Sequence, residues 1–114
     1  MAQDGRYLTE KGQGKTIENP PGILRTTMAY EDSVMLCHFL MRKGATIPLH
    51  NHDAVQSGYV IRGKVRFLSD EGEAFTAEAG TGYLFGSNQR HGAEVLEEAE
   101  LVECFSPMRP EYAD

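Results

Sequence analysis

The sequence predicts an all-β protein, built as one antiparallel barrel, jelly roll or sandwich. Three observations support this. A chain of 114 residues has room for one domain. Short apolar runs recur about every ten residues and are separated by Gly, Asn or acidic turn residues, which is typical of such folds. No stretch carries the i, i+3, i+4, i+7 apolar stripe of an amphipathic helix.

The elements follow in order after a polar segment, residues 1–21. This segment is either disordered or an added strand, which could pair with a second subunit. The rest, residues 22–114, forms the barrel. Its expected strands are 22–32, 33–44, 46–52, 56–63, the two halves of 64–80 around the hairpin Asp70-Glu71-Gly72, 83–86, 90–96 and 100–107. Both faces of 33–44 are apolar, which predicts a strand covered on both sides. The acidic run 94–100 is expected to be a solvated turn.

Charge and composition exclude several classes of protein. Eleven Lys and Arg against 17 Asp and Glu give a net charge of −6, so a general nucleic-acid binder is not expected. The chain has no run of 18 apolar residues and no apolar leader, so we expect a cytoplasmic protein with no membrane partner. Two cysteines do not make a disulfide framework.

Histidines supply the first candidate site. His50 and His52 are two residues apart, so on a strand both imidazoles point to one face. His91 begins another expected strand, and Gln56 follows His52 by four residues. Such a set suits one divalent transition metal ion, which could be Ni, Zn, Fe, Mn, Co or Cu. The alternative is that these histidines only make structural hydrogen bonds.

A carboxylate near the carboxyl end is the second candidate. Glu103 and Phe105 share one face of an apolar strand, where a carboxyl group has a raised pKa that suits a general acid or base. The alternative is an ion pair between Glu103 and Arg62, Arg66 or Arg109. The guanidinium of Arg109 is suited to holding a substrate carboxylate, although an exposed position is an equal alternative.

Three aromatic side chains are expected to line the substrate pocket inside the barrel: Tyr59, Phe67 and Phe105. They are assigned to the wall of the pocket, not to the chemistry. His38 is expected to have a structural role.

Two segments resemble the paired motifs of the cupin superfamily. GATIPLHNHDAVQSGYVIRG, residues 44–63, resembles the first motif, G-x5-HxH-x3,4-E-x6-G. GTGYLFGSNQRH, residues 80–91, resembles the start of the second, G-x5-PxG-x2-H-x3-N. The resemblance implies a double-stranded β-helix, a jelly-roll barrel, in which the metal is held by His50, His52, Gln56 and His91.

The sequence departs from these motifs at four positions. Gln56 stands where most cupins have Glu, Gly86 and Asn88 replace Pro and Gly, and Val95 replaces Asn. Because an amide is neutral, a site with three imidazoles and Gln56 leaves the full charge of the metal available as a Lewis acid. Any proton transfer then needs another group, for which Glu103 is the candidate.

Further stretches are similar to the KdgF-like group of small cupins of pectin degradation. HNHDAVQSGYVIRGKVRF resembles that group's HxHPHEQxxYVxxGxxxF block, and ECFSPMRPEY resembles its closing D-x-FSPxREDY. The resemblance implies roles in substrate handling for Glu103, Phe105 and Arg109. It also implies a homodimer and the linearisation of 4,5-unsaturated uronate monomers, a small-molecule substrate. Two alternatives stay open: a metal-dependent dioxygenase and a non-enzymatic module that binds a metabolite.

Overall fold

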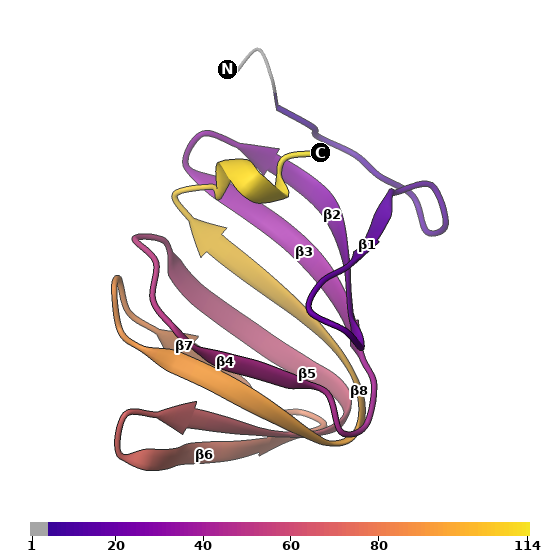
Figure 1. Cartoon of the computed structure of the whole chain (residues 1–114). Coiled ribbons are helices and arrows are strands. Elements are labelled where there is room, and N and C mark those ends of the chain that lie inside the picture. Colours follow the sequence, from indigo (N-terminus) through magenta and orange to yellow (C-terminus); the bar gives the residue numbers. More distant parts are fainter. Residues whose placement is uncertain (1–4) are drawn as a thin grey trace.

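The computed structural model describes residues 5–114 and contains one eight-stranded antiparallel sheet that curls into a jelly-roll barrel (Figure 1). The all-β prediction is therefore confirmed. A short 3-10 helix, Pro110–Tyr112, follows the last strand. The strands are β1 Thr16–Glu18, β2 Ile23–Glu31, β3 Val34–Met41, β4 Thr46–His50, β5 Val55–Ser69, β6 Gly72–Glu78, β7 Gly82–Phe85 and β8 His91–Ser106.

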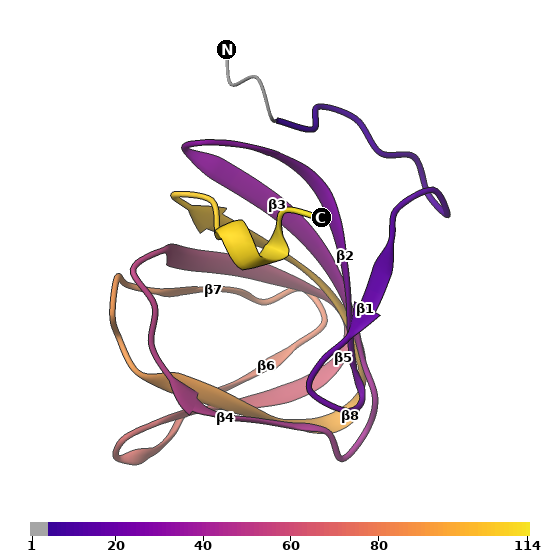
Figure 2. The ribbon, with the colours of Figure 1, turned by 45° about the horizontal axis from the view of Figure 1, so that its top comes forward.

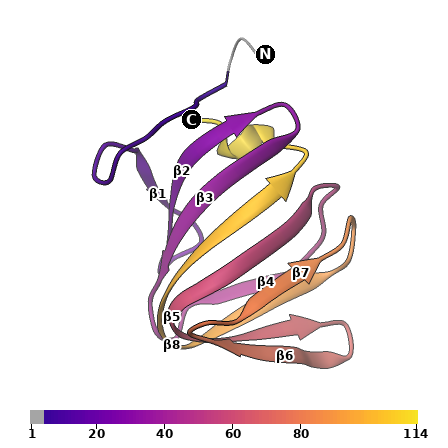
Figure 3. The same cartoon turned by 180° about the vertical axis from the view of Figure 1, so that it is seen from behind.

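The two long strands, β5 and β8, form the spine of the barrel. They pair with each other from Val55↔Ser106 to Leu68↔Gly92. The carboxyl-terminal half of β8 pairs with β3 and its amino-terminal half with β4. Similarly, β5 pairs first with β7 and then with β6. Each long strand thus changes its outer partner half-way along, and the sheet curls back toward itself (Figures 2 and 3).

β5 and β8 are each one continuous strand, whereas the sequence analysis divided each of them into two. The acidic run 94–100 lies inside β8 and is not a turn. Basic residues of β5 face it: Arg66 Nη2 is 2.5 Å from Glu94 Oε2, and Arg62 Nε is 3.3 Å from Glu100 Oε1. Opposite charges on neighbouring strands favour pairing. The acidic run therefore continues the strand.

The prediction that β3 is covered on both sides was also wrong, because only one face of this strand is buried. Met35, Cys37 and Phe39 are buried in the barrel, whereas Val34 and Leu36 on the other face are exposed. The barrel interior supplies a cover for one face of a strand only.

The homodimer expected from the sequence is not tested by a single chain and stays a prediction.

The polar segment 1–21 contributes a strand to the barrel of its own chain. β1 pairs with β2, from Thr16↔Thr26 to Glu18↔Leu24. The following residues, Asn19 and Pro20, reach the mouth of the barrel beside the carboxyl-terminal segment. Residues 1–4 of the segment lie outside the described residues. No helix among the described residues is long and apolar enough to cross a membrane.

Gly63 lets β5 bend without ending. The register between β5 and β8 shifts three times between Val60 and Val65, and Gly63 has φ +91°. Such bulges bend a strand and change which side chains face inward. Gln56 and Val60 face the interior before the bend, and Val65 and Phe67 face it afterwards.

Replacing Gly63 with Ala should destabilise the fold strongly. A Cβ at this position would lie 2.2 Å from the Glu98 carbonyl oxygen and 2.5 Å from the Ala99 Cα. We expect the free energy of unfolding to fall by about 2–5 kcal/mol, from the unfavourable φ together with the clash. Gly72→Ala is the matched control, because Gly72 has φ +103° and an added Cβ would meet no atom within 4 Å. Urea unfolding of both variants measures the difference, and equal losses would contradict the explanation.

Candidate metal centre

Three histidines from different parts of the chain meet at the mouth of the barrel. His50 ends β4, His91 begins β8, and the two are directly paired across these strands. His52 lies in the turn before β5. The three potential ligand nitrogens lie within 4.8 Å of one another. Ligand atoms grouped this closely could hold one metal ion between them.

The backbone fixes the orientation of each imidazole. The Nδ1 of every one of these histidines lies 2.8–2.9 Å from a carbonyl oxygen two residues away along the chain. A carbonyl only accepts hydrogen bonds, so each Nδ1 carries the proton and donates it. Each Nε2 then has its lone pair free toward the centre of the cluster. This is the form in which histidine binds metals.

Gln56 completes the cluster from the start of β5. Its Oε1 lies 3.1 Å from the Nε2 of both His52 and His91. Its Nε2 donates a hydrogen bond of 2.7 Å to Glu103 Oε2, which turns the amide oxygen toward the histidines. The Nε2 atoms of the histidines and the amide oxygen are all hydrogen-bond acceptors, so they cannot bond to one another. Only a donor or a cation placed between them can satisfy them. One divalent transition metal ion fits this donor set, and the set does not select among those that accept imidazole.

Burial keeps His52 and His91 neutral. The pKa of His91 is lowered to about 4, chiefly because the ring is removed from water and stacks on Phe85, with centroids 4.4 Å apart. Loss of solvation also lowers the pKa of His52. Neutral imidazole is the metal-binding form, so burial prepares the cluster to bind a cation near neutral pH.

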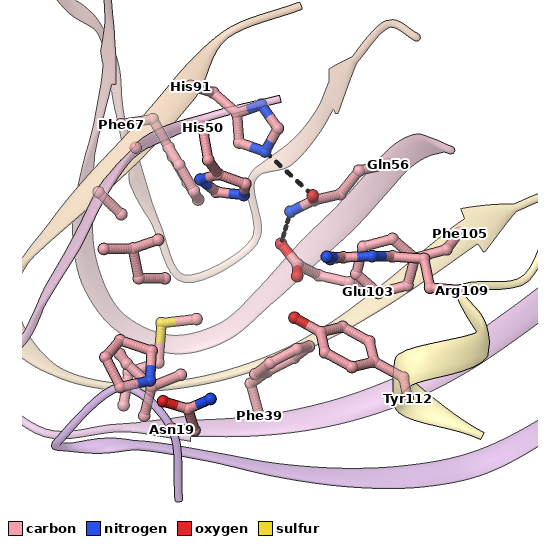
Figure 4. A pocket seen from close by; sticks show the side chains of 16 residues that line it. Asn19, Phe39, His50, Gln56, Phe67, His91, Glu103, Phe105, Arg109 and Tyr112 are labelled. Carbon is pink, nitrogen blue, oxygen red and sulfur yellow. Dashed lines mark hydrogen bonds between the residues drawn. The ribbon is translucent and has the colours of Figure 1, made fainter. Parts of the chain in front are cut away.

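Glu103 lies beside the cluster, on the inward face of β8, and is 4% exposed. Gln56 donates to its Oε2 (Figure 4). The hydroxyl of Tyr83 donates to the same oxygen. Within residues 5–114, its Oε1 has no hydrogen-bond partner. Burial raises the pKa of Glu103, although the bonds from Tyr83 and Gln56 oppose that rise. One carboxylate oxygen is thus anchored and the other is available for proton exchange.

The ion pairs given as the alternative role of Glu103 are absent from the described part of the chain. Arg62 and Arg66 bond to Glu100 and Glu94 on the outer side. Tyr83 is a contact that the sequence analysis missed. The residue in the sequence that relates to this contact is Gly58. A Cβ added there would lie 2.3 Å from the Tyr83 hydroxyl, so glycine leaves room for the phenol to reach Glu103.

Arg109 lies over the aromatic wall of the site. Its guanidinium carbon is 5.2 Å from the centre of the Phe105 ring and 4.2 Å from that of Tyr112. Nη2 bonds to Glu111 at 3.1 Å, while Nε is buried and has no partner among the described residues. The guanidinium therefore lies beside the cavity with part of its donor capacity unused.

The aromatic side chains expected around the pocket divide into two groups. Phe67 and Phe105 are buried and line the cavity. Tyr59 does not, which corrects the sequence analysis: it is 50% exposed on the outer face of β5. Gln56 and Tyr59 are three residues apart, so their side chains leave a strand on opposite faces. His38 also faces outward, where its Nε2 lies 2.7 Å from Glu100 Oε2.

Two adjoining cavities lie beside the histidines and share part of their lining. The inner one, about 70 Å³, has His50, His91, Gln56 and Glu103 in its wall. The outer one, about 420 Å³, opens at the mouth. Residues that line both form the neck between them: Asn19, Pro20, Ile47, His50, Arg109 and Tyr112.

Comparison with known proteins places this architecture in a family. The cupin domain profile matches residues 37–105, which include the three histidines and Gln56. The chain is a cupin. Over 93 residues it is 33% identical to the pectin degradation protein KdgF of Dickeya dadantii (strain 3937), covering 80% of this chain and 84% of that protein. The resemblance to the KdgF group noted in the sequence is thereby confirmed.

Two solved structures support the same cupin fold. An RmlC-like cupin from Shewanella frigidimarina NCIMB 400 superposes with a TM-score of 0.85 at 22% identity, covering 94% of this chain and 96% of that one. KdgF from Halomonas sp. superposes with a TM-score of 0.82 at 24% identity, covering 91% and 97%. At these identities the two matches show the fold alone.

Removing one histidine of the cluster should release the metal. For His52→Ala we expect the affinity for a divalent ion to fall by at least about 100-fold, because even the loss of an outer hydrogen-bond partner costs 10- to 100-fold. Elemental analysis of the purified protein and titration with Zn²⁺ or Ni²⁺ measure the effect. His38→Gln is the control on the outer face. Equal metal content in both variants would contradict the assigned site.

The metal-free protein should lose stability as the pH falls. The unfolded chain binds a proton at each histidine near pH 6.5, whereas folded His91 binds one near pH 4. The stabilisation is present above pH 6.5 and is lost between 6.5 and 4, at a cost of up to about 3 kcal/mol. The raised pKa of Glu103 acts in the opposite direction. Urea unfolding with a chelator at pH 7 and pH 4.5 should therefore show a smaller loss for His91→Gln than for the unchanged protein. An identical loss in both would exclude His91 as the cause.

Proposed function

We propose that this cupin is a metal-dependent enzyme that linearises 4,5-unsaturated uronate monomers released from pectin or alginate. The observation that carries the proposal is a buried carboxylate with one free oxygen beside a cluster that fits a metal. The 33% identity to a pectin degradation protein supports the substrate class. Arg109 and the aromatic wall support a small anionic ligand.

Each part of the substrate has a matching group in the cavity. The proposed substrate is a six-membered ring with a hemiacetal at C1, a double bond between C4 and C5, and a carboxylate on C5. The guanidinium of Arg109, with an unpaired Nε, holds the carboxylate. Phe105 packs against the ring. A metal held by His50, His52, Gln56 and His91 supplies Lewis acidity toward the oxygen atoms of the ligand.

Glu103 moves the proton that ring opening requires. Its free Oε1 takes the proton of the C1 hydroxyl while the bond between C1 and the ring oxygen breaks. The electron pair of that bond stays on the ring oxygen, which gives an aldehyde at C1 and an enolate over C4 and C5. Return of the proton to C4 yields the open-chain keto uronate, so atoms and electrons balance within one isomerisation. The raised pKa of Glu103 suits a group that both accepts and returns a proton.

Glu103→Gln should remove this step and preserve the site. The amide oxygen of the variant can still accept from Gln56 and Tyr83, whereas the free position can no longer exchange a proton. We expect kcat to fall about 10²- to 10⁴-fold with unchanged metal content. The loss of ultraviolet absorbance, as the C4–C5 double bond is consumed, measures the rate. Glu98→Gln, an exposed position on the same strand, is the matched control.

The same assay separates the alternatives. Full activity of Glu103→Gln would overturn the role of Glu103. Metal-loaded protein that consumes no unsaturated uronate would overturn the proposed reaction. Oxygen uptake with an enediol or diketone would then favour a dioxygenase, and binding without turnover would favour a metabolite-binding module.

A further inference from the structure

Tyr112 combines a rigidly held ring with a free hydroxyl. Its ring lies between two guanidinium groups, with the carbon of Arg25 at 4.3 Å and that of Arg109 at 4.2 Å from the ring centre. Phe105 meets it edge to face, with centroids 5.6 Å apart. The Tyr112 carbonyl accepts hydrogen bonds from Thr27 Oγ1 at 2.7 Å and Arg25 Nη1 at 3.2 Å. These contacts fix both the backbone and the ring plane.

The hydroxyl of this ring points into the cavity. Figure 4 shows it directed toward the space beside Glu103. It makes no hydrogen bond within the described residues 5–114. Burial raises the pKa of Tyr112, so the hydroxyl stays protonated and can both donate and accept. A polar group held this rigidly and left unpaired is prepared for a ligand, because little further ordering is needed on binding.

Asn19 lies across the cavity from His50 and His91 (Figure 4). It follows β1, and its backbone N–H donates 3.0 Å to the Ile23 carbonyl, which fixes its position. Its side-chain amide has no hydrogen-bond partner in the described part of the chain. Asn19 and Tyr112 both line the inner and the outer cavity, so they stand at the neck between the two.

The volume of the cavity determines which part of a ligand contacts Tyr112 and Asn19. The inner part of about 70 Å³ admits a few atoms beside the histidines, while ligands of ordinary size need several hundred Å³. A ligand that reaches the histidines therefore extends through the neck into the outer 420 Å³. Its outer portion passes Tyr112 and Asn19.

We propose that Tyr112 and Asn19 form a hydroxyl-binding subsite that selects polyhydroxylated ligands at the metal end of the barrel. An amide and a phenol each donate and accept, which matches the two-way hydrogen bonding of an alcohol. Arg109 offers donors only and matches a carboxylate. The cavity thus separates recognition of the anion from recognition of the hydroxyl groups. This inference rests on the proposed function, since it names the part of the same substrate that these residues contact.

Binding to metal-loaded protein tests the subsite without turnover. The first probe is galacturonate, which carries the ring, the carboxylate and hydroxyl groups but lacks the double bond. The second is tetrahydropyran-2-carboxylate, which keeps the ring and the carboxylate without hydroxyl groups. Tyr112→Phe removes only the hydroxyl and retains the ring between Arg25 and Arg109. We expect Tyr112→Phe and Asn19→Ala each to weaken galacturonate about 3- to 10-fold and to change the second probe less than 2-fold.

Tyr59→Phe, on the outer face, is the matched control and should bind both probes like the unchanged protein. Equal weakening of both probes would overturn the subsite, because it would indicate a general disturbance of the cavity. Unchanged binding of galacturonate by both variants would also overturn it and leave the proposed function standing. If the unchanged metal-loaded protein binds neither probe, the subsite is overturned, whereas the proposed function is decided separately by consumption of the unsaturated uronate.

Discussion

The pairing of β5 with β8 is the constraint on which the rest of the structure depends. Side chains alternate along β8, so His91, Glu103 and Phe105, each separated by an even number of residues, all face the interior. β5 brings Gln56 opposite Phe105 and Gly58 opposite Glu103. The histidines, Gln56 and a buried acid, from distant parts of the sequence, thereby meet at one mouth of the barrel. The bulge around Gly63 turns the second half of β5, so that Phe67 closes the interior behind them.

Gln56 is the link between the two halves of the site. Its amide can present oxygen to the histidines only while its nitrogen faces Glu103. Most cupins have Glu here, and a carboxylate could not donate to Glu103 in this way. The neutral amide therefore serves two purposes: it leaves the charge of a bound metal uncompensated, and it holds one oxygen of the neighbouring acid. Tyr83 holds the same oxygen from the opposite side, so the other stays free.

The carboxyl-terminal segment supplies the wall that the barrel strands leave open. Arg25, on β2, pins Tyr112 and bonds to Asp114, and Tyr112 in turn supports Arg109. β1 and Asn19 close the other side of the mouth. The cavity is thus lined by residues beyond the 37–105 span that the family profile matches.

The sequence by itself determined the all-β class, the histidine and glutamine set, and the inward face of Glu103, because spacing along a strand fixes the face of each side chain. It did not show that the four strands expected over these residues are the two long strands β5 and β8. The acidic run becomes part of a strand only because charges such as those of Arg62 and Glu100 compensate each other across neighbouring strands. The sequence analysis placed Tyr59 inside the barrel, although its separation of three residues from Gln56 puts the two side chains on opposite faces of a strand. Tertiary structure alone decided the partners of Glu103, the stack of Arg25, Tyr112 and Arg109, and the position of Asn19. Glu103 with Gln56 and Tyr83, and Arg25 with Tyr112, are contacts between residues far apart in sequence, so no local pattern predicts them.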